Sequence, residues 1–496
     1  MATTLIIRGG LVLDAAHFLG PADILVHDGR IAAIGAPGMD APDGAEPIDA
    51  SRRLLHSGLV NAHTHGHGNL GKSLGDAWTL ELLLAAGPWI SGMVGADEKR
   101  LAATIGAAEM VLKGCTAVYD LFVELPGPTR DGIDAVAEAY HSVGMRAVIA
   151  PMVADMTLYE AVPSLADAVL ADAVPRSVAQ ARLPPWTETV AAMRDILHHW
   201  RWDRDLIRPA VAPTIPIHCR DDFLLACRDI AKEFGAGLHS HLAESKVQAV
   251  VGAERYGRSL TAHLDALGLL GPHFTAAHGV WLDASDMAIL GRHGASVAHN
   301  PASNMRLGNG VADMAGLLAA GVNVGIGTDA ATCSDNLNMY GSMHFAAAAS
   351  HAQSPDPKRW VRNPQVLEAA TIGSARALGM PHIGRVAPGY AADIVFLDLD
   401  APTLIPLNDP VNQLVMGEDG TSVHSVMIGG RWVVRDRKLL TVDLQRLAAQ
   451  AETTRASMQA RNAQRRSDFE CVAPIIADFC PALAARPWPI NRFCAC

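Results

Sequence analysis

The chain has little of what marks secreted, membrane-spanning or nucleic-acid-binding proteins. Its eight cysteines are scattered along 496 residues and are not paired at the spacings of a disulfide framework, a usage typical of the reducing cytoplasm. No apolar run approaches the ~18 residues that a bilayer-spanning helix needs. Acidic residues outnumber basic ones, 51 to 40, whereas nucleic-acid binding depends on clustered Lys and Arg. We therefore expect a cytoplasmic protein with no membrane partner and no nucleic-acid partner.

Half of the residues are hydrophobic, which is enough to build a large core. From about residue 64 onward, strand-like runs alternate with helical segments, the pattern of repeated β-α units. Including the first run, the strand-like runs are at 59–65, 116–121, 146–152, 207–211, 237–242, 274–278, 295–299 and 322–327. Helical segments are expected at 77–91, 97–113, 131–143, 154–201, 220–234, 256–268, 284–292 and 311–319. Eight such units predict an α/β fold with a closed (β/α)8 TIM barrel. The alternative, a doubly wound open sheet, lacks a Gly-rich dinucleotide fingerprint after any early strand.

The two ends of the chain differ from the middle. Residues 1–56 and 385–440 are rich in short strand-like runs and Gly-containing turns. Neither segment is long enough to bury a sheet alone, so we expect both to combine into one small β-sandwich domain beside a barrel of residues 57–384. Residues 441–496 are predicted to form a charged amphipathic helix, ending near 466, and a loose Cys-containing tail.

Metal-capable side chains stand where several predicted strands end. His63 and His65 are one residue apart in the first strand, so their side chains point to the same face. The fifth to eighth strands end near His241, His278, His299 and Asp329. Because active-site residues of a barrel lie at the carboxyl ends of its strands, we expect these side chains to meet at one mouth. His239 shares a face with His241; the residues alone leave open which is the ligand, although His241 is nearer the end of the strand.

Three imidazoles and one carboxylate leave room for a water molecule on a single divalent metal ion. Such an ion lowers the pKa of its water to about 7 and supplies hydroxide at neutral pH. Glu244, three residues after His241, can reach over the mouth towards that water; the alternative is a carboxylate that stabilises a helix N-terminus. The fourth-strand region, 208–214, has no lysine that could be carbamylated to bridge two metals. We therefore expect one metal ion.

These motifs resemble the amidohydrolase superfamily, in particular the mononuclear branch of cytosine, guanine and S-adenosylhomocysteine deaminases and triazine hydrolases. The resemblance covers residues 1 to about 440. Its motifs are GLVNAHTH (58–65), HSHLAES (239–245), AHG (277–279), HNPASN (299–304), RLG (306–308) and GTD (327–329), with a return strand at 384–393. It implies that the metal is Zn²⁺, with Fe²⁺ as the alternative, and that its ligands are His63, His65, His241 and Asp329.

The resemblance also implies a reaction and catalytic roles. Glu244 becomes the proton shuttle, and His278 orients the hydroxide and stabilises developing charge. Asp329 passes a proton to the leaving group, and His299 lies behind the ligands or contacts the substrate. The implied reaction is hydrolytic deamination of a small N-heterocycle (purine, pterin, pyrimidine or triazine-like), in which metal-bound hydroxide attacks a ring carbon and ammonia leaves. The bond broken is a C–N bond other than a peptide bond, in a cyclic amidine.

Two other functions stay open at this point. The same ligand set serves hydrolases that release chloride, an alkylamine or an amide-derived group, and the fold does not separate them. The alternative from another class is a catalytically inactive binding barrel. That alternative predicts loss of a metal ligand or of Glu244, and none of these residues is missing.

Candidate substrate contacts come from the first loop and from strand exits. Where many related deaminases carry Arg-Gly after the first histidine pair, this chain has NLGKS at 69–73. The residues that we expect to contact the substrate are His67, Asn69, Lys72, Trp78, His218, Trp281 and His299. The alternatives are an ordinary solvated loop and a tryptophan that caps the barrel rim. The long 154–203 connection is expected to be a lid or an oligomer contact, and the Ala-rich outer helices favour a homo-oligomer.

Overall fold

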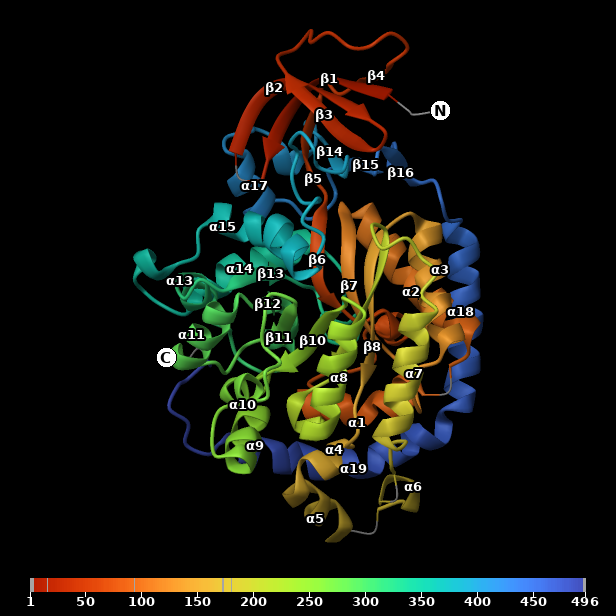
Figure 1. Ribbon diagram of the computed structural model, residues 1–496, viewed down its shortest axis with the longest axis vertical. Helices are drawn as coiled ribbons and strands as arrows, with labels where there is room; N and C mark the ends of the chain where they lie inside the picture. Colours follow the sequence, from red (N-terminus) through yellow and green to blue (C-terminus); the bar gives the residue numbers. More distant parts are fainter. Residues whose placement is uncertain (1–3, 16, 93, 172–173, 180, 494–496) are drawn as a thin grey trace.

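The computed structural model describes residues 4–15, 17–92, 94–171, 174–179 and 181–493. Eight parallel strands form a nearly closed barrel that is surrounded by helices, and a separate sheet domain lies at one end (Figure 1). The barrel strands are β6(Leu59–Thr64), β7(Cys115–Val123), β8(Arg146–Val153), β9(Ile207–Pro213), β10(Gly237–Leu242), β11(Phe274–His278), β12(Ser296–His299) and β13(Asn323–Ile326). The predicted barrel, with a sheet domain made from both chain ends, is confirmed.

Helices follow the strands and form the outer layer. Up to β10 they are α1(Leu80–Ser91), α2(Ala96–Leu112), α3(Arg130–Val143), α4(Leu158–Ala161), α5(Pro163–Ala171), α6(Arg176–Ala179), α7(Trp186–His198) and α8(Asp221–Glu233), with short turns η1(Gly66–Gly71) and η2(Pro216–His218). Beyond β10 they are α9(Lys246–Tyr256), α10(Leu260–Ala266), α11(Ala284–His293), α12(Pro301–Arg306), α13(Met314–Ala319), α14(Met339–Ala352), α15(Asn363–Glu368), α16(Ser374–Ala377) and α17(Pro410–Met416), with η3(Pro357–Arg359), η4(Ala369–Gly373) and η5(Pro402–Leu404).

The barrel strands run in sequence order from β6 to β13, and every neighbouring pair is parallel. The last gap lies between β13 and β6. There the backbone N–H of Asp329 donates to the carbonyl of His63 (2.9 Å), and the amide of Asn61 both donates to and accepts from Thr328. Because all eight strands point the same way around this nearly closed ring, their carboxyl ends face one mouth.

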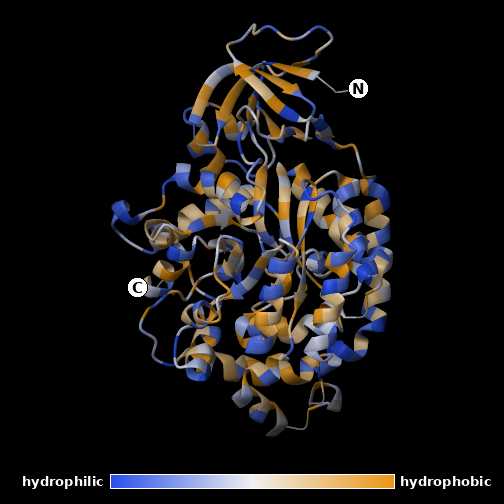
Figure 2. Cartoon of the chain, in the orientation of Figure 1, coloured by the Kyte–Doolittle hydropathy of each residue, from blue (hydrophilic) through white to orange (hydrophobic). Residues whose placement is uncertain are grey.

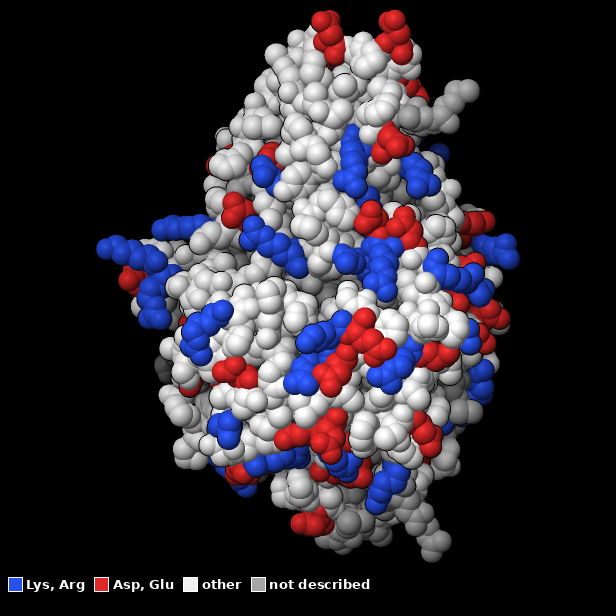
Figure 3. Space-filling model, in the orientation of Figure 1, with Lys and Arg blue, Asp and Glu red and all other residues white. Residues whose placement is uncertain are grey.

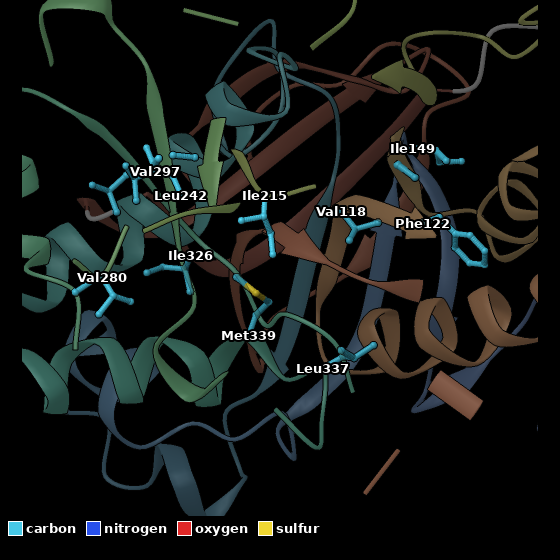
Figure 4. Packing of buried hydrophobic residues seen from close by; sticks show 14 of the residues in the cluster. Val118, Phe122, Ile149, Ile215, Leu242, Val280, Val297, Ile326, Leu337 and Met339 are labelled. Atoms are coloured by element: carbon cyan, nitrogen blue, oxygen red, sulfur yellow. The ribbon is translucent and has the colours of Figure 1, made fainter. Parts of the chain in front are cut away.

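Buried apolar side chains hold the strands and helices together. Val118 and Phe122 of β7 belong to the same core as Ile149 of β8 and Leu242 of β10 (Figure 4). Full burial of such a side chain contributes about 1.5–3 kcal/mol each. Apolar residues follow the strands and the inner sides of helices, and polar residues lie on the outside (Figure 2). On the face shown in Figure 3, acidic and basic side chains are interspersed.

The sheet domain joins the two ends of the chain. Its strands are β1(Thr4–Asp14), β2(His17–His27), β3(Arg30–Gly35), β4(Glu46–Asp49), β5(Arg53–Ser57), β14(Ile394–Asp398), β15(Val423–Ile428), β16(Arg431–Arg435) and β17(Lys438–Leu439). All nine form one hydrogen-bonded sheet, in which the antiparallel pair β5–β14 connects the N-terminal strands to the C-terminal ones. Ile24 of β2 and Phe396 of β14 belong to one core that is separate from that of the barrel. The predicted boundaries near residues 57 and 385 stay predictions.

Two of the predicted helical segments have the wrong bounds. The segment predicted as one helical stretch from 154 to 201 contains four helices, α4 to α7, and Pro184 and Pro185 precede α7, because proline disfavours the helix interior. The predicted helix 256–268 corresponds to the shorter α10, which Ser259 caps; the preceding α9, which is followed by Gly257 with a φ of +64°, was not predicted. Glycine takes this left-handed conformation without steric cost, which makes it a common helix stop.

The C-terminal segment is more ordered than expected. A predicted helix to about 466 followed by a loose tail is replaced by α18(Leu444–Arg461) and α19(Ala463–Ala484). Between them, the Asn462 side chain donates to the carbonyls of Trp89 and Gly92. Helix α19 continues through Pro474 and Pro481 and packs against α1, α5 and α9, beneath the barrel in Figure 1. Residues 494–496, with the two cysteines of the predicted tail, lie outside the described residues.

Among the described residues, no helix combines the length and the apolar character that crossing a bilayer requires. The described cysteines are free thiols, namely Cys115, Cys219, Cys227, Cys333, Cys471 and Cys480.

Candidate metal centre

Four side chains from three strands converge at the carboxyl mouth of the barrel. His63 and His65 come from the end of β6, His241 from β10, and Asp329 from the loop after β13. Nε2 of His65 lies 3.2 Å from Nε2 of His241 and 3.3 Å from Oδ1 of Asp329, and Nε2 of His63 lies 3.6 Å from that oxygen. Two ligands at about 2.0–2.1 Å from a tetrahedral zinc ion lie about 3.3 Å apart. The distances from His65 to His241 and to Asp329 match this spacing, and the distance from His63 to Asp329 is slightly longer.

Hydrogen bonds to backbone carbonyls orient two of the imidazoles. Nδ1 of His65 donates to the carbonyl of Leu121 (2.7 Å), and Nδ1 of His241 donates to that of Thr214 (2.6 Å). Each Nδ1 therefore carries the ring proton, which leaves a lone pair on each Nε2. Two lone pairs 3.2 Å apart cannot form a hydrogen bond with each other, whereas a cation between them is attracted to both. The donor set is thus suited to a metal ion.

The charge states of these groups match those of metal ligands. Burial lowers the pKa of His63 to about 3 and that of His241 well below its usual value, so both imidazoles are neutral at pH 7. Burial alone would raise the pKa of Asp329, but hydrogen bonding to His63 and the neighbouring imidazoles hold it well below its usual range. The Asp329 carboxylate also accepts hydrogen bonds from Ser303 Oγ (2.6 Å) and from the backbone N–H of Ala330 (2.7 Å).

Glu244 and His278 lie beside the four donors. Oε2 of Glu244 is 3.5 Å from Nε2 of His278, and that nitrogen is 3.8 Å from Oδ2 of Asp329. Burial, together with the charge of Asp329, raises the pKa of Glu244 well above its usual value. Asn309 donates to Oε1 of Glu244 (3.1 Å), whereas Oε2 has no hydrogen-bond partner among the described residues. Glu244 is therefore placed to accept and to return a proton.

Three residues at this mouth have a left-handed backbone conformation. They are Ala243 (φ +49°), His278 (φ +70°) and Asp329 (φ +63°). Residues other than glycine rarely adopt it, and it costs on the order of 1–3 kcal/mol at each position. The surrounding contacts hold His278 in place, since its Nδ1 donates to Oδ1 of Asn304 (2.8 Å). Backbone strain is thus concentrated where the metal-capable and acid–base side chains meet.

A cavity of about 460 Å³ lies over this centre, within the usual range for a small-molecule site. Its inner wall includes His65, His241, Glu244, His278 and Asp329. Of the predicted substrate contacts, His67 and His218 line the cavity. Burial lowers the pKa of His67 well below its usual value and that of His218 to about 4, so both are neutral hydrogen-bonding groups at pH 7.

The other five predicted contacts are not among the residues that line the cavity, and their contact with the substrate stays a prediction. The Asn69 amide donates to the carbonyls of Gly66 and Ala102, and Lys72 forms an ion pair with Glu109. Both side chains therefore hold the first loop against α2, in contrast to the ordinary solvated loop given as the alternative above.

The side chains of Trp78, Trp281 and His299 pack against other parts of the protein. Trp78 packs against Phe469 with ring centroids 5.3 Å apart. Trp281 is buried and donates to the carbonyl of Asn309 (2.8 Å). His299 is buried at the end of β12 and is not among the residues that line the cavity. His239 lies deeper than His241, as expected, but the hydrogen-bonded role expected for it is not seen, because neither ring nitrogen has a partner among the described residues.

The sequence interpretation missed cavity residues in α19. Arg465, Asp468, Phe469 and Val472 all line the cavity. The signal was the spacing of Phe469, Val472 and Ile476, which puts apolar side chains on one face of a helix. Because that segment was assigned to a loose tail, it was not connected to the site.

Comparisons with known proteins agree with this geometry. The profile of the amidohydrolase family matches residues 54–433. A 5-methylthioadenosine/S-adenosylhomocysteine deaminase of Syntrophobacter fumaroxidans is 33% identical over 89% of this chain and 95% of that protein. A 5'-deoxyadenosine deaminase of Methanopyrus kandleri is 30% identical over 89% of this chain and 96% of that protein.

Two solved structures share the fold. An adenosine deaminase from Xanthomonas campestris with bound zinc has a TM-score of 0.81 and 28% identity, covering 92% of this chain and 99% of that one. A triazine hydrolase from Arthrobacter aurescens has a TM-score of 0.82 and 25% identity, covering 91% and 99%. The family profile and these relatives, taken with the site geometry, show that the chain belongs to the amidohydrolase family.

Proposed function

We propose that the protein is a metal-dependent hydrolytic deaminase that releases ammonia from a small N-heterocycle, a purine, pterin, pyrimidine or triazine-like ring. The observation that carries this proposal is the convergence of His63, His65, His241 and Asp329 at one mouth, with Glu244 and His278 beside them. The relatives are named as deaminases and triazine hydrolases, and hydrolysis of C–N bonds in cyclic amidines is common to the deaminases among them.

One divalent ion is proposed at the four donors, Zn²⁺ first and Fe²⁺ as the alternative. Zinc is supported by the bound zinc of the Xanthomonas campestris structure and by the facing Nε2 lone pairs of His65 and His241. Such an ion lowers the pKa of water and polarises the attacked centre. Asp329 supplies an oxygen ligand, and the three imidazoles supply nitrogen ligands.

The chain's own residues supply proton transfer. We assign Glu244 to take the proton of the attacking water and return it to a ring nitrogen, since burial raises the pKa of its carboxyl well above the usual value and so favours proton uptake. His278, held through Nδ1 by Asn304, keeps Nε2 towards Glu244 and positions the attacking oxygen. Asp329 passes the second proton to the departing ammonia. His67 and His218 of the cavity wall are proposed to hydrogen-bond the heterocycle.

A second leaving group, chloride or an alkylamine, is the competing form of the same hydrolysis. It is favoured by the similarity to triazine hydrolases, one of which is named as an atrazine chlorohydrolase complexed with zinc. A catalytically inactive binding barrel is disfavoured because every proposed ligand and Glu244 are present at the mouth. An amide hydrolase stays a further alternative at the same site.

The experiment that tests the proposal is hydrolysis by the zinc-loaded enzyme over a panel of pterins, purines, pyrimidines and triazines. Ammonia, chloride and alkylamine are measured in parallel. Ammonia as the product of at least one heterocycle supports the deaminase, chloride or alkylamine supports the competing form, and no hydrolysis of any ring contradicts both.

A cytoplasmic location is proposed on the free cysteines, and a homo-oligomer on the Ala-rich outer helices. Size-exclusion chromatography with light scattering measures the oligomeric state directly.

A further inference from the structure

We propose that helix α19 completes the substrate cavity with an apolar subsite, formed around Phe469 and Val472, that binds an alkyl or aryl substituent on the heterocycle. The inference rests on the proposed function, because it concerns the substrate of the same site. Helix α19 spans Ala463–Ala484 and lies outside residues 54–433, which match the family profile. The subsite is therefore a feature of this chain's C-terminal segment.

Residues of the candidate metal centre and residues of helix α19 line one and the same cavity. The residues that line it include His241, Glu244 and Asp329 at the barrel mouth and Phe469 and Val472 on α19. Figure 1 shows α19 running beneath the barrel, on the side away from the sheet domain. A substrate whose ring lies at the barrel mouth can therefore extend towards α19 within the same space.

The ring of Phe469 is held in a fixed position by two tryptophans. Trp89 stacks on it with centroids 5.7 Å apart and an interplanar angle of 26°, and Trp78 meets it edge-on at 5.3 Å. Phe469 and Val472 are 7% and 1% exposed, so both side chains are packed into the protein around the cavity. Aromatic clusters of this kind restrict ring motion and add about 0.5–1.5 kcal/mol per pair beyond burial. The apolar wall is thus preformed.

The charged groups next to this wall already have partners. Asp468 accepts hydrogen bonds from Ser177 (2.7 Å) and from Gln464 (3.0 Å), and Arg465 donates to Asn462 (3.0 Å). Ser177 lies on α6, so the Asp468 contact ties α19 to the 154–203 connection. These hydrogen bonds fix the helix in place, and each of them is made with a neutral partner.

Glu124, which also lines the cavity, is used in the same way. Its carboxylate forms a buried ion pair with Lys99 and accepts hydrogen bonds from the backbone and hydroxyl of Thr129. Many of the other side chains that line the cavity are apolar, among them Leu83, Leu84, Ile90, Met156 and Leu158, and hydroxyl groups such as those of Ser91, Thr157 and Thr189 are fewer.

This composition favours an apolar substituent over a hydroxylated one. A hydroxyl group buried against apolar side chains without a partner loses its hydrogen bonds to water, which costs free energy. Each methylene buried there gains about fourfold in binding. We therefore expect the enzyme to prefer an alkylated heterocycle to the same ring carrying a sugar-like polyol of similar length.

The test compares a heterocycle that the enzyme hydrolyses in two forms, with a hydrogen or with an n-propyl group at a ring position remote from the leaving group. Wild type is expected to prefer the propyl form by about tenfold or more in kcat/KM. F469A is expected to reduce that preference at least threefold, and V472F to reduce it as well by filling the subsite. F469L, which keeps the position apolar, should fall between wild type and F469A.

The matched control is F479A, which removes the same ring from the same helix at a position that does not line the cavity. It is expected to leave the preference for propyl unchanged, even if the melting temperature falls. A preference that is unchanged in both F469A and V472F, with circular dichroism showing both folded, would overturn the inference. A polyol form preferred to the propyl form would overturn it too.

A binding measurement separates this inference from the proposed function. If no heterocycle of the panel is hydrolysed, the proposed function fails. The subsite can then still be tested with ring analogues that lack the leaving group, by calorimetric titration of wild type, F469A and F479A. Tighter binding of the propyl analogue to wild type and F479A, but not to F469A, supports the subsite, and equal binding to all three contradicts it.

Discussion

His65 and His241 face each other through their Nε2 atoms at 3.2 Å, although 176 residues of sequence separate them. Both Nδ1 atoms donate to backbone carbonyls, so both facing nitrogens present lone pairs. This pair, with His63 and the Asp329 carboxylate, makes the mouth of the barrel a strong site for one divalent cation. The predictions below follow from that arrangement and from the contacts that support it.

Glu244→Gln is expected to reduce turnover by about 10²–10⁴-fold while the protein keeps its metal. The amide is nearly the same size but cannot take up and return a proton, which is the contribution assigned to Glu244. Steady-state kinetics on the best substrate of the panel, with metal content measured on the same samples, check this. A variant with nearly normal kcat would show that Glu244 is not the proton carrier.

Ser303→Ala is expected to weaken metal binding about 10–100-fold without removing a ligand. Ser303 Oγ donates to Oδ2 of Asp329 at 2.6 Å, and hydrogen bonds that orient a ligand typically have effects of that size. Competition for zinc with a chelator measures the affinity. Ser467→Ala, at an exposed serine of α19, is the control and should match wild type. Equal affinities in all three proteins would remove Ser303 from the account.

Arg146→Ala is expected to destabilise the protein by about 3–5 kcal/mol. Arg146 of β8 binds Asp393, which precedes β14, through two hydrogen bonds of 2.7 and 3.0 Å, and both side chains are buried. Removing one partner leaves the other charge buried and unpaired. Arg52→Ala, which breaks an exposed pair with Asp400, should cost about 0–1 kcal/mol. Chemical denaturation compares the two, and similar losses would contradict the ranking.

Lowering the pH is expected to reduce the free energy of unfolding, in part because His56 becomes protonated. Burial lowers the pKa of His56 to about 4, below the unfolded value of about 6.5. The stabilisation from the neutral buried ring is therefore complete above pH 6.5 and is lost as the pH falls towards 4. Between these values it changes the free energy of unfolding by about 1.4 kcal/mol per pH unit.

The measurement is the free energy of unfolding at pH 6 and pH 5 for wild type and His56→Gln. The change between the two pH values should be smaller in the variant by about 1.2 kcal/mol. His56 lies away from the proposed ligands and hydrogen-bonds to Tyr340 and Ser57, so metal binding is expected to be unaffected. An identical pH dependence in both proteins would show that His56 does not contribute.

Much of the fold and of the centre could be predicted from the sequence because both depend on local periodicity. The strand ends at His65, His241 and Asp329 could be read from short apolar runs, and the barrel rule then brought them to one mouth. The sheet domain could be predicted because both chain ends are rich in short strand-like runs separated by Gly-containing turns. These predictions needed no knowledge of side-chain direction beyond the alternation along a strand.

The substrate wall could not be predicted in the same way, since it depends on which loop side chains turn inward. Asn69 and Lys72 were assigned to the substrate by proximity to the histidines, but partners in the neighbouring α2 use both side chains. Phe469 was missed because the two prolines of α19 suggested an irregular tail. Tertiary contacts with α1, α5 and α9 stabilise that helix, and the apolar spacing along it indicates a buried face without indicating which elements cover that face.

The central claim, that His63, His65, His241 and Asp329 together bind one divalent ion needed for hydrolysis, is tested most directly by elemental analysis alongside activity. We predict about one transition metal ion per chain in the wild type. We also predict that His241→Ala loses both the metal and the hydrolysis of the heterocycle. Wild-type protein that hydrolyses a heterocycle without any bound transition metal, or His241→Ala protein that keeps a full metal ion, would contradict the account.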